Sequence, residues 1–106
     1  MAWALLSIAG ILEIAFALSM KLSEGFTRLI PSLATVVTGA SSVFLLSLAL
    51  RTLQVGTAYA VWTGIGAAGT AILGMAVLGD SIAPMRVICI GLILAGVIGL
   101  RLASAS

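Results

Sequence analysis

Four apolar runs, each long enough to cross a bilayer, limit what this chain can fold into. They cover about residues 2–21, 31–50, 56–78 and 84–102, and all five Lys and Arg residues lie at or near their ends. About 20 residues of α-helix span the roughly 30 Å hydrocarbon core of a membrane. We therefore predict an all-α integral membrane protein with four transmembrane helices, forming a single domain over residues 1–106.

The composition excludes several classes of function. Hydrophobic residues make up 62% of the chain and charged residues 8%, whereas a soluble domain is about a quarter charged. The net charge of +2 is scattered, which argues against nucleic-acid binding, and no Gly-rich phosphate loop is present. There is no histidine, and the single cysteine, Cys89, lies in an apolar run, so we expect no metal site, disulfide or cofactor.

The loop charges bear on orientation in the membrane. Lys21, Arg28 and Arg86 fall on one side of a four-span chain, and Arg51 and Arg101 fall on the other. This near balance permits insertion in both orientations, although the first helix could still fix a single orientation. Two oppositely oriented copies would supply the inverted halves that many transporters use to alternate access.

Glu13 is the only acid in the middle of an apolar run, because Glu24 and Asp80 lie at run edges where water can reach them. Ionisable groups in hydrocarbon are costly, and they usually mark a path for ions, protons or substrate. No Lys or Arg lies at mid-span to pair with Glu13. Small helical neighbours, including Gly10, leave room beside the carboxylate. We predict that Glu13 exchanges a proton for a cation; the alternative is a protonated structural residue.

The third run places two aromatic residues on one helix face. Tyr59 and Trp62 are three positions apart, and such rings can bind a cation or donate a hydrogen bond to a carboxylate. Anchoring at the membrane interface is the alternative, especially for Tyr59. Gly64 and Gly66 follow and weaken the helix, so we predict a hinge or a close helix contact at Gly64.

The remaining polar and small residues predict helix contacts. Thr38, Ser41 and Ser42 carry hydroxyls near mid-membrane; these hydroxyls could bond their own backbone, or either serine could donate to Glu13. The fourth run has small residues at a spacing of four, which suits close packing of two helices. This stripe predicts a dimer interface at Gly91, Ala95, Gly96 and Gly99.

Over essentially the whole chain, these features resemble the small multidrug resistance family of proton-coupled cation exporters. The resemblance is carried by the lone Glu13, the loop from Gly25 to Ser32, and the run from Gly56 to Gly66. Gly10, the segment Leu78-Gly79-Asp80 and the later Pro84-Met85-Arg86 are similar to the guanidinium-exporter branch.

The resemblance implies an antiparallel homodimer in a bacterial inner membrane. Its two Glu13 carboxylates would bind either protons or a small organic cation, such as a guanidinium or quaternary ammonium compound. Tyr59 and Trp62 would line this site, Ser42 would join its hydrogen bonds, and the fourth helices would meet at the dimer contact. Phe16 departs from the branch, which usually has a tryptophan there; phenylalanine lacks the N–H donor. Together with small residues at 38–41, this change favours larger, more apolar cations.

Two other classes of membrane protein fit parts of the pattern. A proton-carrying rotor-ring subunit also has a lone glutamate in a spanning helix, but its helices pack through dense glycine runs, and Gly10 stands alone in the first run here. A subunit that needs a different partner chain usually carries a fixed charge bias, which this chain lacks. An enzyme is not expected, because the chain has no nucleophile–base pair.

Overall fold

The computed structural model describes residues 1–105 and confirms the prediction of an all-α chain with four helices. All four are long and apolar enough to span a membrane, so this is a multi-pass membrane protein. The second helix begins ahead of Pro31, which lies in its first turn, where a missing N–H is tolerated. The helices are α1 (Ala2–Leu22), α2 (Leu29–Ala49), α3 (Val55–Val77) and α4 (Pro84–Ala105).

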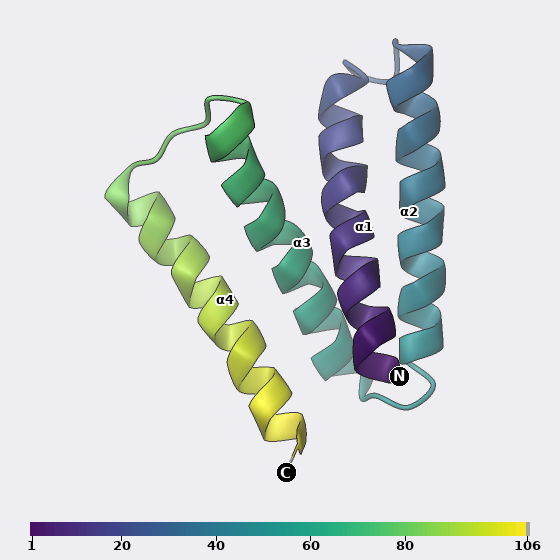
Figure 1. The fold of residues 1–106 in the computed structure, drawn as a ribbon, viewed down its shortest axis with the longest axis vertical. Coiled ribbons are helices and arrows are strands. Elements are labelled where there is room, and N and C mark those ends of the chain that lie inside the picture. The colour runs from purple at the N-terminus through teal and green to yellow at the C-terminus, as the bar shows by residue number, and fades with distance from the viewer. Residues whose placement is uncertain (106) are drawn as a thin grey trace.

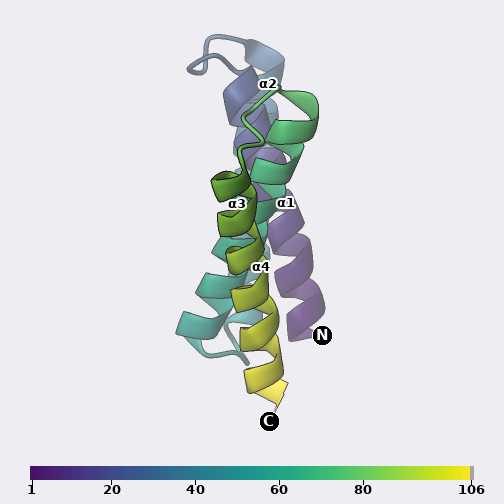
Figure 2. The same ribbon diagram turned by 90° about the vertical axis from the view of Figure 1, so that its left-hand side faces the viewer.

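The helices form a single layer in the order α2, α1, α3, α4 (Figure 1). α1 packs along both α2 and α3, whereas α4 packs against α3 and lies at the outer edge. The layer is only 16 Å in its shortest dimension, as the edge-on view shows (Figure 2). The α1–α2 and α3–α4 loops lie at one end, and both termini lie at the other with the α2–α3 loop (Figure 1).

The buried core lies toward the end that carries the termini. Its members are small or aliphatic side chains from the first three helices: Leu6, Ala9, Leu46, Ala49, Ala58 and Val61. Toward the other end α1 and α3 diverge (Figure 1). The close packing therefore holds one half of the bundle together and leaves space in the half beyond Glu13.

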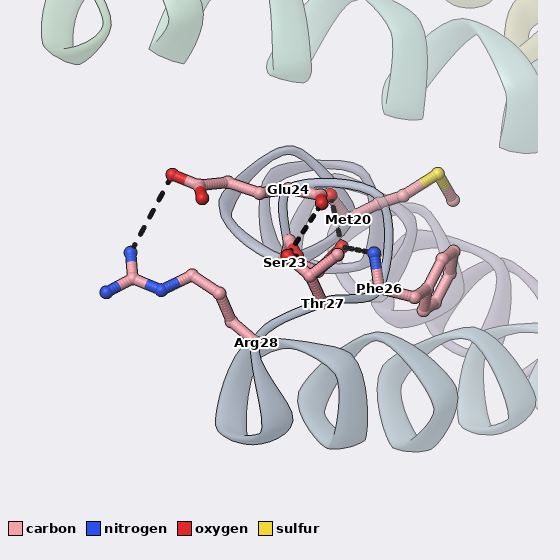
Figure 3. A network of polar contacts seen from close by, with 6 residues as sticks. All are labelled: Met20, Ser23, Glu24, Phe26, Thr27 and Arg28. Atoms are coloured by element: carbon pink, nitrogen blue, oxygen red, sulfur yellow. Dashed lines mark hydrogen bonds and ion pairs between the residues drawn. The ribbon is translucent and has the colours of Figure 1, made fainter.

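The α1–α2 loop is a tight turn built around Ser23, which is fully buried (Figure 3). The Ser23 hydroxyl donates to the Met20 carbonyl at 2.7 Å and accepts the Phe26 N–H at 3.0 Å. Glu24 and Phe26 adopt left-handed backbone conformations, and an exposed ion pair joins Glu24 to Arg28 at 4.0 Å. These bonds hold the loop in a defined shape at the end of α1.

Contacts with other parts of the chain form near both ends of α4. Asp80, in the loop before α4, donates its N–H to the Gly74 carbonyl of α3 at 3.1 Å. The Asp80 carboxylate forms an ion pair with Arg86, in the first turn of α4, at 3.6 Å. Gly79 makes this return possible through a left-handed conformation with φ of 75°. Near the other end, the Arg101 guanidinium lies 4.5 Å from the centre of the Trp3 ring, a cation–π contact with α1.

Candidate functional site

Glu13 lies near the middle of α1, where α1 and α3 come into close contact. Its side chain packs over Gly66, and a Cβ atom at that position would overlap the Glu13 methylene groups. One turn earlier in α1, the Ile65 side chain packs over Gly10, where an added Cβ atom would overlap it. Glycine at these positions therefore allows α1 and α3 to approach and places the Glu13 carboxylate beside α3.

Two cavities meet at Glu13 and Phe16, which line both of them. The first, of about 440 Å³, lies between α1 and α3, and the second, of about 570 Å³, lies between α1 and α2. We call them the α1–α3 cavity and the α1–α2 cavity. The Glu13 side chain is consequently accessible from both sides of α1.

The two cavities differ in chemistry. The α1–α3 cavity carries polar groups, from Thr63, Thr70, Asp80 and Arg86. Both cavities are mainly apolar, and the α1–α2 cavity is the more apolar of the two. Besides Glu13 and Phe16, the lining of the α1–α2 cavity consists of Met20, Phe26, Thr35, Val36, Gly39, Ala40, Val43 and Trp62. Sequence reasoning set Asp80 aside as an acid at a run edge and missed Thr70 altogether. Thr63, Gly66, Thr70 and Gly74 are three or four residues apart, so they share one face of α3. This spacing could have indicated from the sequence that Thr63 and Thr70 line the same cavity.

A hydrogen-bond chain one turn from Glu13 joins the first three helices. Trp62 Nε1 donates to Ser42 Oγ at 2.9 Å, and Ser42 Oγ donates to the Ala9 carbonyl at 2.6 Å. Ser42 is fully buried, and its one hydroxyl hydrogen is committed to Ala9, so it does not donate to Glu13 here. Thr38 instead bonds within its own helix, to the Ala34 carbonyl at 2.6 Å.

We expect Ser42→Ala to lower the free energy of unfolding by about 1–3 kcal/mol, because the partly buried Trp62 N–H loses its acceptor. The measurement is thermal and denaturant unfolding of the purified protein in detergent. Ser47→Ala is the matched control, since the Ser47 hydroxyl bonds the Phe44 carbonyl within α2 and is exposed. Equal stability of the two variants would show that the bond chain does not hold the helices together.

The other residues singled out from the sequence lie farther from the two cavities. Tyr59 is 56% exposed and contacts the Trp62 ring at 5.5 Å between centroids, but it lines neither cavity. α3 runs unbroken through Gly64, which packs against Val97 of α4, so a hinge there stays a prediction. The stripe of small residues on α4 is exposed throughout; it consists of Gly91, Ala95, Gly96 and Gly99. A Cβ atom added to any of its three glycines would meet nothing within 4 Å in the described chain.

The arrangement leaves the Glu13 carboxylate available to a ligand. Within residues 1–105, the acids that form ion pairs are Glu24 and Asp80, each with an arginine at the membrane edge. Among the described residues no cluster of His, Cys, Asp and Glu could hold a metal ion. A mid-membrane carboxylate where two mainly apolar cavities meet can hold a proton or an organic cation, and either one neutralises the charge of the carboxylate.

Comparisons with known proteins cover nearly the whole chain. The family described as "Small Multidrug Resistance protein" matches residues 1–93. A guanidinium exporter from Yersinia pseudotuberculosis is 60% identical over 104 residues, covering 98% of this chain and 100% of that protein. Guanidinium exporters from Citrobacter freundii and Salmonella typhimurium are 54% and 52% identical, again over 98% of this chain and 99% of each relative.

Proposed function

The chain belongs to the small multidrug resistance family, and from this membership we propose that it exports small organic cations in exchange for protons. The observation that carries the proposal is the position of Glu13, half-buried at mid-membrane where two cavities meet. One carboxylate cannot hold a proton and a cation at the same time. Each therefore displaces the other, which couples inward proton movement to outward movement of the cation.

A second copy of the chain completes the transporter in this proposal. A single layer of four helices leaves its faces uncovered, and the exposed small-residue stripe of α4 suits close packing with another α4. The near balance of loop charges is compatible with a partner of opposite orientation. An antiparallel homodimer in a bacterial inner membrane would place two Glu13 carboxylates around one site. The transporter would then present the same structure to both sides of the membrane.

The proposed substrates are guanidinyl compounds together with quaternary ammonium compounds. The α1–α2 cavity offers apolar space beside Glu13, and its wall at Gly39 and Ala40 carries almost no side chain. Phe16 packs its ring against Gly39 and supplies no hydrogen-bond donor to the carboxylate. Alkyl groups can occupy this cavity while the cationic centre lies at Glu13.

Transport currents test this function and its substrate range. In proteoliposomes of the purified chain on a solid-supported membrane, we expect currents from both guanidinium and a bulky quaternary ammonium ion. We expect Phe16→Trp to lower the bulky-cation current about tenfold relative to guanidinium, since one steric or polar mismatch is worth about 1–3 kcal/mol. The added indole fills apolar space and offers an N–H to the carboxylate.

Phe16→Leu is the control, because it changes the shape of the side chain without adding a donor. An unchanged ratio of the two currents in Phe16→Trp would remove Phe16 from substrate selection. If the purified wild-type chain gave no current from either cation, the proposal of a self-sufficient exporter would be wrong.

A further inference from the structure

The α1–α3 cavity contains a second carboxylate, at its membrane-edge end. Asp80 lies over Gly74 of α3, and a Cβ atom added to Gly74 would overlap the Oδ2 atom of Asp80. Glu13 lies over Gly66 in the same cavity. From Gly66 to Gly74 the helix rises about 12 Å, which is roughly the distance along α3 that separates the two acids. The cavity thus connects an acid at the membrane edge to the acid at its centre.

Thr70 lies between these acids on the same face of α3, one turn from Gly66. Its hydroxyl oxygen is buried and has no hydrogen-bond partner in the part of the chain that the structure describes. Threonine in a helix commonly bonds the carbonyl four residues earlier, as Thr35 does with Pro31 at 2.7 Å. A buried hydroxyl left without a partner is unfavourable unless a ligand or water supplies one.

Arg86 holds Asp80 only loosely. The Nη2 to Oδ2 distance is 3.6 Å, longer than a hydrogen bond, and the two side chains are 40% and 47% exposed. Exposed pairs of this kind contribute little to stability. The Arg86 Nε atom is buried without a partner among residues 1–105. The head group of Arg86 is itself a guanidinium, so a free guanidinium ion can form the same pair with Asp80.

We propose that Asp80 is a second cation subsite, at the membrane-edge entrance of the path to Glu13. Arg86 occupies this subsite when no substrate is present, and an entering guanidinium ion replaces it. The Thr70 oxygen then accepts an N–H bond from the cation on its way to Glu13. The inference rests on the proposed function and deepens it, because in an antiparallel dimer one such subsite lies at each membrane face.

The first test compares two acids at the same end of the bundle. We expect Asp80→Asn to raise the KM for guanidinium transport about two- to fivefold at low ionic strength, with little change in the maximal rate. Glu24→Gln is the matched control, because Glu24 is also paired with an arginine but lies outside both Glu13 cavities. Equal KM values for the two variants would overturn the assignment.

Thr70→Val separates a ligand contact from a structural role. Valine has nearly the same shape, and the hydroxyl it removes has no partner in the described chain, so we expect the unfolding temperature to be retained. We expect the guanidinium transport rate to fall about tenfold or more, the order of one hydrogen bond to a charged group. Tetramethylammonium has no N–H donor, and its rate should not change. Equal losses for both cations, or none, would exclude Thr70 from the path.

A binding measurement distinguishes failure of this subsite from failure of the proposed function. In Glu13→Gln protein labelled with ¹⁵N-arginine, guanidinium chloride should shift the side-chain resonance of Arg86, and equal sodium chloride should not. The further change Asp80→Asn should abolish the shift. A shift that persists without Asp80 would overturn the subsite, whatever the transport assay shows. Absence of guanidinium transport by the wild type would instead contradict the proposed function.

Discussion

Glu13→Gln should abolish coupled transport of every cation. Glutamine keeps the size of the side chain but can neither carry the negative charge nor release a proton in the working pH range. The cation then enters a mid-membrane site that does not neutralise its charge, which is strongly unfavourable. We expect substrate-induced currents to fall by more than about 100-fold, equivalent to roughly 2.7 kcal/mol.

The matched control for this loss is Glu24→Gln, which removes an exposed carboxylate at the end of α1. Its currents should stay close to those of the wild type. Unfolding temperatures should be equal for both variants, since Glu13 forms no ion pair with the described residues. Persistent proton-coupled currents in Glu13→Gln would show that another group carries the proton, and the assignment of Glu13 would be wrong.

The four helices could be predicted because each apolar run carries its own evidence. Membrane-spanning length, charged ends and the position of Pro31 are all local properties, and the structure has a helix in each predicted run. Glu13 could be singled out for the same reason, since a lone acid at mid-span needs no knowledge of its neighbours in space.

The contacts between helices could not be predicted in the same way. Both Ser41 and Ser42 suited a contact with Glu13 by position, and only the packing of α1, α2 and α3 shows that Ser42 bonds Ala9 and Trp62 instead. Asp80 follows the end of α3 in the sequence. It nevertheless lines the Glu13 cavity, because Gly79 turns the chain back over α3.

The contact of Glu13 with Gly66 leads to the prediction with the second-largest effect. A methyl group at residue 66 would overlap the Glu13 side chain, so Gly66→Ala has to displace the carboxylate or separate α1 from α3. Overpacking of this kind costs about 1–3 kcal/mol, whereas Ala in place of Gly favours helix formation by about 1 kcal/mol. The net change in stability should therefore be small, while a displaced carboxylate should lower guanidinium transport about tenfold or more.

Gly56→Ala provides the control within the same helix, because a Cβ atom there meets nothing within 4 Å among the described residues. Residue 56 lies in the first turn of α3, so Gly56→Ala should gain less helix propensity than Gly66→Ala. It should keep wild-type transport, because the added methyl group contacts none of the described residues. The measurement pairs unfolding temperature with initial transport rate for each variant. Wild-type transport by Gly66→Ala would show that function tolerates a shift of Glu13 away from α3. The close contact of α1 with α3 would then serve helix packing and not the placement of the carboxylate.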